Sequence, residues 1–73
     1  MARYKLISFL ESEPGDEREV GGQRKKTKAE IRQWFSDNIE ACGLDWRVGN
    51  TIKFKNSATV YEWRWINDNS RVR

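Results

Sequence analysis

The residue types that could do chemistry in this chain favour binding over catalysis. The 73 residues contain no histidine and a single cysteine, so a serine or cysteine nucleophile would lack its usual imidazole base. A zinc site would have at most one thiolate ligand. Carboxylates that could act as an acid–base pair crowd together in residues 11–19, a polar stretch where water would solvate them. We therefore expect no enzymatic activity, no cofactor and no metal.

A basic cluster is the first candidate binding site. Its members are Arg24, Lys25, Lys26 and Lys28. They run into the start of a predicted helix, where the first backbone amides also attract anions, so a phosphate backbone or an acidic protein surface would fit. The alternative is that they neutralise residues 11–19, where five acidic side chains face one arginine. That stretch has a local charge of −4. The rest of the chain carries +7, and the two together give the net charge of +3.

An aromatic segment near the C-terminus is the second candidate site. Tyr61, Trp63 and Trp65 occupy alternate positions, so on a strand their rings share one face. Rings beside an arginine such as Arg64 can stack nucleic-acid bases. The alternative, which we favour, is that this face belongs to the core. Four tryptophans are more than so small a core needs, so we expect Trp46 or Trp65 to be an exposed interface anchor.

The end of the chain carries two further candidate residues. Residues 67–73 are polar and are predicted to form a frayed tail. Arg71 and Arg73 lie in it and are candidate contacts to RNA. A tail of this kind is more often inert.

The clearest local signal is a helix over residues 28–42 that would support these sites. Thr27 and Glu30 have the spacing of a capping box, and Gly43 supplies a left-handed ending. Apolar side chains recur at helical spacing on one face, at Ile31, Trp34, Phe35, Ile39 and Cys42. Cys42 is therefore expected to be a small core residue.

Alternating apolar and polar residues predict an antiparallel sheet of about three strands. These strands cover residues 3–10, 46–55 and 58–66. Gly49-Asn50 inside the second segment is either a bulge or a turn that starts a separate short strand.

Between the first strand and the helix, residues 11–26 are polar and contain Pro14-Gly15 and Gly21-Gly22. They predict a long mobile loop. Residues 1–73 are thus expected to be one small α+β domain, with a helix across a small antiparallel sheet.

The sequence also bears on location. The apolar stretch near the N-terminus is interrupted at Glu11, too early for a signal peptide, and no run approaches the roughly 20 apolar residues of a membrane span. A lone cysteine is typical of a reducing compartment. We expect a cytoplasmic monomer that has a macromolecular partner, and neither a membrane nor a small molecule as its target.

Several of these features occur together in a known kind of protein. The short chain without histidine, the R-K-K-x-K run, the acidic stretch and the Trp-Arg-Trp segment resemble a small transcription regulator of a lytic bacteriophage of plant-pathogenic bacteria. The resemblance implies binding to the host RNA polymerase near its RNA exit region. It also implies inhibition of promoter-dependent initiation through the sigma subunit, antitermination, and action in the bacterial host cytoplasm. It assigns no role to any single residue.

Two other functions remain open on the sequence. One is a direct RNA- or DNA-binding module, in which the basic cluster and exposed rings contact nucleic acid without a protein intermediary. The other is an inhibitor of a bacterial defence nuclease. An inhibitor that mimics DNA would need strong negative charge, and this chain has a net charge of +3.

Overall fold

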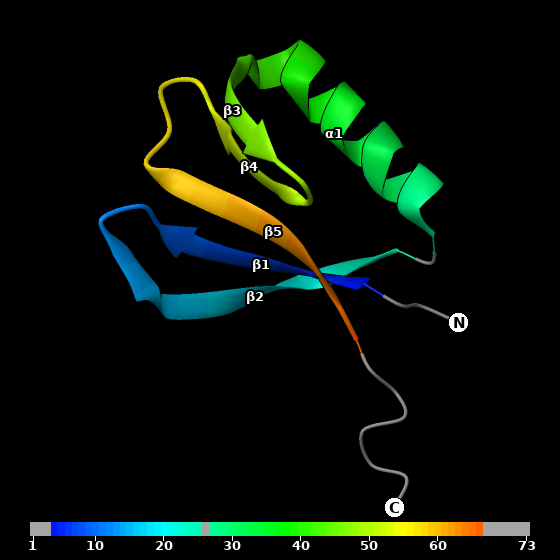
Figure 1. Ribbon diagram of the computed structural model, residues 1–73, viewed down its shortest axis with the longest axis horizontal. Helices are drawn as coiled ribbons and strands as arrows, with labels where there is room; N and C mark the ends of the chain where they lie inside the picture. The colour runs from blue at the N-terminus through cyan, green and yellow to red at the C-terminus, as the bar shows by residue number, and fades with distance from the viewer. Residues whose placement is uncertain (1–3, 26, 67–73) are drawn as a thin grey trace, which may run out of the picture.

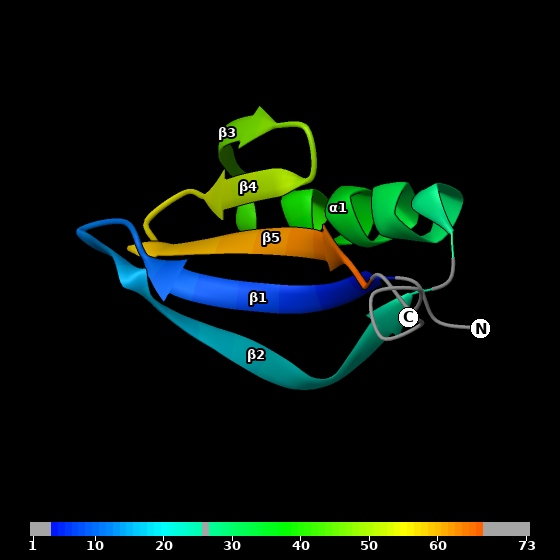
Figure 2. The same cartoon turned by 60° about the horizontal axis from the view of Figure 1, so that its bottom comes forward.

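The protein folds as a five-stranded antiparallel sheet with one helix against one of its faces (Figures 1 and 2). The computed structural model describes residues 4–25 and 27–66. The elements in chain order are β1 (Tyr4–Leu10), β2 (Glu13–Lys25), α1 (Lys28–Cys42), β3 (Leu44–Val48), β4 (Thr51–Phe54) and β5 (Thr59–Trp65). The order across the sheet is β2-β1-β5-β4-β3, so β1 and β5 are adjacent although they lie far apart in the sequence.

The predicted loop over residues 11–26 is wrong, because most of it forms the edge strand β2. The pairing of β2 with the shorter β1 has two irregularities. In the first, Lys5 and Ile7 of β1 are two positions apart, but their partners on β2, Arg24 and Glu19, are five positions apart. The glycines of that stretch lie inside the irregularity, and Gly22 has a φ of 78°. An edge strand tolerates polar residues, prolines and glycines at bulges because its outer side faces solvent.

The predicted count of about three strands is wrong for a second reason. Residues 46–55 were expected to form one strand, but they lie in two antiparallel strands, β3 and β4. Gly49, with a φ of 60°, and Asn50 form the turn between them. The turn interpretation of Gly49-Asn50 is therefore correct, and the hairpin that it makes adds an edge strand to the sheet.

The helix begins and ends where the sequence predicts. The Glu30 amide donates to Thr27 Oγ1 at 3.2 Å and the Thr27 amide donates to Glu30 Oε1 at 2.9 Å, which completes the capping box. The Gly43 amide donates to the Ile39 carbonyl at 2.7 Å, with a φ of 83° at Gly43. Cys42 is exposed, which corrects its predicted place in the core. The buried residues of α1 are Ile31 and Phe35, so the last turn of α1 extends past the core.

The core lies between α1 and the face of the sheet that α1 covers. Its buried side chains are Tyr4, Leu6, Ile31, Phe35, Ile52, Phe54 and Trp63, with Val20, Trp34, Ile39 and Tyr61 packed against them. Trp34 makes an edge contact with Trp63 at 5.4 Å between ring centroids. The expectation that the aromatic face of the last strand forms the core is confirmed for Trp63, whereas Trp65 stays 54% exposed.

Candidate functional site

Trp65 is held at the end of the sheet by the strand register. Tyr4 of β1 lies opposite Trp65 of β5 on one side and Lys25 of β2 on the other. Directly paired residues of antiparallel strands point to the same face. Tyr4 is 6% exposed, and its ring meets the Trp65 ring edge-on, with the centroids 5.1 Å apart and the planes at 77°. A buried tyrosine therefore supports a tryptophan ring that remains more than half exposed.

One lysine shares the row and the face of this ring, because Tyr4 pairs with both Trp65 and Lys25. Lys28 is the first residue of α1, the helix that covers this face. Lys5 pairs with Arg24 and Arg64 and so points to the opposite face. The views of Figures 1 and 2 agree that the end of β5, the start of β1 and the end of β2 meet near the start of α1. Within residues 4–25 and 27–66, neither Lys25 nor Lys28 forms an ion pair. We name this surface the cationic end, and its members are Tyr4, Lys25, Lys28 and Trp65.

Arg24 and Arg64, two of the four arginines predicted to bind a partner, are instead engaged within the fold. Arg64 donates to both carboxylate oxygens of Glu17, at 2.8 and 2.9 Å, and to Glu62 at 2.8 Å. Arg24 bonds to Glu19 at 2.7 Å. These hydrogen bonds raise the pKa of Arg64 and lower the pKa of Glu17. The sequence predicts neither pairing, because Glu17 and Glu19 lie on a segment interpreted as a loop.

The predicted site residues do not form one surface. Trp46 lies opposite Lys53 on the face turned away from α1. Lys53 in turn pairs with Val60, and Val60 with Phe9, so these four residues form one row across the sheet. Trp65 belongs to the row of Tyr4, on the other face. Of the basic cluster, Lys25 and Lys28 belong to the cationic end. Lys26, Arg71 and Arg73 lie outside the described residues.

The face of the sheet opposite α1 is the second notable surface. Val48 is 71% exposed there, at the end of the edge strand β3, next to the half-buried Trp46. Lys53 bonds to Asp45 at 2.7 Å on this face, and this hydrogen bond raises the pKa of Lys53. We name this surface the open face and define it by Phe9, Trp46, Val48, Lys53 and Glu62. Apolar side chains surrounded by ion pairs are typical of surfaces that dock another protein.

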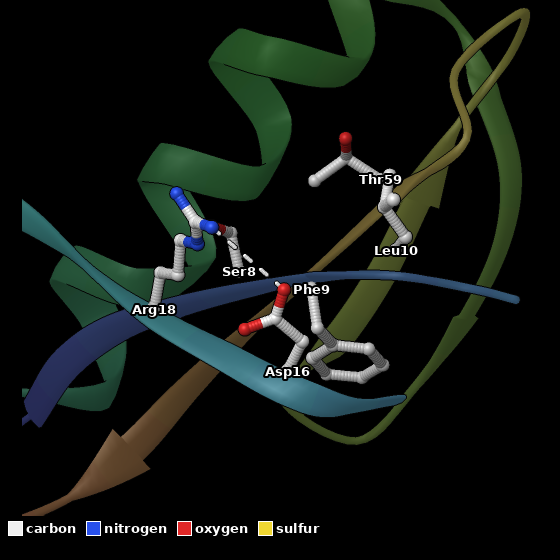
Figure 3. A pocket seen from close by; sticks show the side chains of 6 residues that line it. All are labelled: Ser8, Phe9, Leu10, Asp16, Arg18 and Thr59. Atoms are coloured by element: carbon white, nitrogen blue, oxygen red, sulfur yellow. Dashed lines mark ion pairs between the residues drawn. The ribbon is translucent and has the colours of Figure 1, made fainter. Parts of the chain in front are cut away.

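A hollow of about 200 Å³ lies at the other end of β1, away from the cationic end (Figure 3). Its lining consists of Ser8, Phe9, Leu10, Asp16, Arg18 and Thr59. Arg18 and Asp16 face each other across its mouth at 3.8 Å, and both side chains are well exposed. An exposed pair of this kind contributes little binding energy, so the hollow offers a ligand weak recognition.

Two other features are absent from residues 4–25 and 27–66. No three potential metal-ligating side chains gather in a cluster there. No helix there is both long and apolar enough to cross a membrane.

Comparison with known proteins adds no assignment. A scan against protein-family models and searches of curated proteins and of solved structures found no match to this chain.

Proposed function

We propose that this protein is a phage-encoded transcription regulator that binds the RNA polymerase of a bacterial host. In this proposal it inhibits promoter-dependent initiation and promotes antitermination, and it acts in the host cytoplasm. The resemblance of the short, basic, tryptophan-rich chain to such a regulator motivates the proposal. The open face is the structural observation that carries it.

The open face has the composition of a docking surface. Val48 and Trp46 project from an edge strand, and 71% of Val48 is exposed to water. An exposed valine gains from burial against a partner, and a tryptophan is the residue type that most often dominates an interface. Because α1 covers the other face of the sheet, a large protein can approach this one without rearrangement of the fold (Figure 2).

The charges around the open face suit a protein partner more than a uniform polyanion. Lys53 is paired with Asp45 at 2.7 Å and lies 4.0 Å from Glu11. Arg64 is paired with Glu17 and Glu62 on the same side of the sheet. Both signs of charge are therefore present, and a partner with complementary charges of both signs gains orientation and association rate from them.

The test is binding of the tagged protein to purified bacterial RNA polymerase after nuclease treatment, combined with promoter-dependent transcription. Val48→Glu should weaken polymerase binding by tenfold or more, since it places a charge in the docked face. Leu10→Glu is the matched control, because Leu10 is 43% exposed and points to the opposite face. It should leave both binding and inhibition unchanged.

Two results would overturn the proposal. One is loss of polymerase binding after nuclease treatment, which would favour a direct nucleic-acid module. The other is equal binding by Val48→Glu and the unmodified protein, with both folded by circular dichroism. That result would show that the open face is not the docking surface.

A further inference from the structure

We infer that the cationic end binds single-stranded nucleic acid, with one base stacked on Trp65 and neighbouring phosphates bound by Lys25 and Lys28. This site lies at the other side and end of the sheet from the open face. It therefore adds a second binding function to polymerase docking, and it does not depend on that docking.

The first argument is the support of the Trp65 ring. Tyr4 holds it edge-on at 5.1 Å and is itself 6% exposed, so the platform is anchored in the core. Trp65 nevertheless keeps 54% of its surface exposed. A fixed and exposed indole is suited to stacking, because little side-chain freedom is lost when a base lies on it.

The second argument is that the lysines around the ring are available. The next row of the sheet holds Arg24, Lys5 and Arg64 and points to the opposite face, where carboxylates bind both arginines at 2.7–2.9 Å. Among the described residues neither Lys25 nor Lys28 has such a partner. Lys25 lies two strands from Trp65, about 10 Å between backbones. A lysine side chain can therefore reach a phosphate next to a base stacked on Trp65.

The third argument selects single strands over duplexes. A base within a duplex is stacked on both sides and leaves no face for Trp65, whereas the bases of a single strand are free to stack on an aromatic ring. Two lysines and a net charge of +3 are too few for tight sequence-independent binding to duplex phosphates.

The test is fluorescence anisotropy of the isolated protein with labelled ten-nucleotide oligouridylate, oligothymidylate and a DNA duplex at low salt. We expect both single strands to bind more tightly than the duplex. The plot of log affinity against log salt concentration should have a slope of about −1.4, because each of two lysine–phosphate contacts in a single strand contributes about −0.7. Tighter binding of the ribose strand would indicate that the 2′-hydroxyl is contacted as well.

The variants separate stacking from charge. Trp65→Ala should weaken binding about tenfold with an unchanged salt slope, and Trp65→Phe should recover most of the affinity. Lys25→Gln should reduce the magnitude of the slope by about 0.7. Lys55→Gln is the matched control: it removes the same charge, but Lys55 bonds to Gly43 at the other end of the helix, about 20 Å away.

The inference is overturned if Trp65→Ala binds single strands as tightly as the unmodified protein, if Lys55→Gln weakens binding as much as Lys25→Gln, or if the duplex binds best. Folding of each variant is checked by amide NMR dispersion. Trp65→Phe keeps the inference falsifiable if Trp65→Ala unfolds, because an aromatic variant that folds without binding also contradicts it. No polymerase is present, so failure here is distinct from failure of the proposed function.

Discussion

Arg64 of β5 donates two hydrogen bonds to Glu17 of β2, at 2.8 and 2.9 Å, although β1 lies between the two strands. The contact joins residues 47 positions apart and connects the outer strand to the centre of the sheet. It also explains why Arg64, which looks like a free anchor in the sequence, is not available to a partner.

This pair predicts a pH dependence of stability. The hydrogen bond from Arg64 lowers the pKa of Glu17 below its ordinary value of 4.5. The ionised Glu17 therefore stabilises the fold above that ordinary value, and the contribution is lost as pH falls through the lowered pKa of the folded state. Glu17→Gln should lower the urea midpoint at pH 7, and its midpoint should approach that of the unmodified protein at pH 3.

Glu13→Gln is the control. Glu13 is an exposed carboxylate without an ion pair among the described residues, so the substitution should leave the midpoint unchanged. A constant gap between Glu17→Gln and the unmodified protein from pH 7 to 3 would contradict the assignment.

The capping box predicts a local contribution to stability. Thr27→Ala removes the oxygen that accepts from the Glu30 amide at 3.2 Å, and the free energy of unfolding should fall by about 1 kcal/mol. Ser36→Ala, on the exposed side of the same helix, should change it little. Chemical denaturation followed by circular dichroism measures both, and equal midpoints for the two variants would show that the cap does not stabilise the helix.

The indole of Trp63 predicts an unequal response to two substitutions. Trp63 is 1% exposed, and its Nε1 has no hydrogen-bond acceptor among the described residues. Trp63→Phe removes this unpaired donor along with some volume, so it should cost less than about 2 kcal/mol. Trp63→Ala opens a large cavity and should cost about 3 to 5 kcal/mol. Thermal unfolding tests the order, and a phenylalanine variant as unstable as the alanine variant would imply that the indole nitrogen is hydrogen-bonded.

Adjacent glycines in β2 offer a matched test of the bulge. Gly22 has a φ of 78°, whereas Gly21 does not lie in the positive-φ region, and a methyl group added at either would meet open space. Gly22→Ala should therefore cost about 1 kcal/mol through backbone strain alone, and Gly21→Ala should be neutral or slightly stabilising. Equal effects in urea denaturation would show that the left-handed conformation does not constrain residue 22.

The helix could be predicted because its signals are local. Thr27 and Glu30 interact within one turn, and Gly43 closes the helix on Ile39 four residues earlier. The assignment of β2 failed although β2 pairs with the strand directly before it, from Leu10↔Glu13 to Tyr4↔Lys25. Two irregularities interrupt that pairing, and Gly21-Gly22 marks a bulge in a strand as readily as it marks a loop.

The sequence by itself determined the helix and its cap, the antiparallel strands β1 and β5, and the supply of lysines and tryptophans, because each depends on residue types at short spacing. Tertiary structure alone decided which of them are exposed and unpaired. Pairing of β1 with β5 buries Trp63 and leaves Trp65 exposed at the end of the same strand face. The return of β2 along β1 uses Arg24 and Arg64 in ion pairs and leaves Lys5 and Lys25 without them. The availability of a side chain depends on neighbours that only the folded chain brings within a few ångströms.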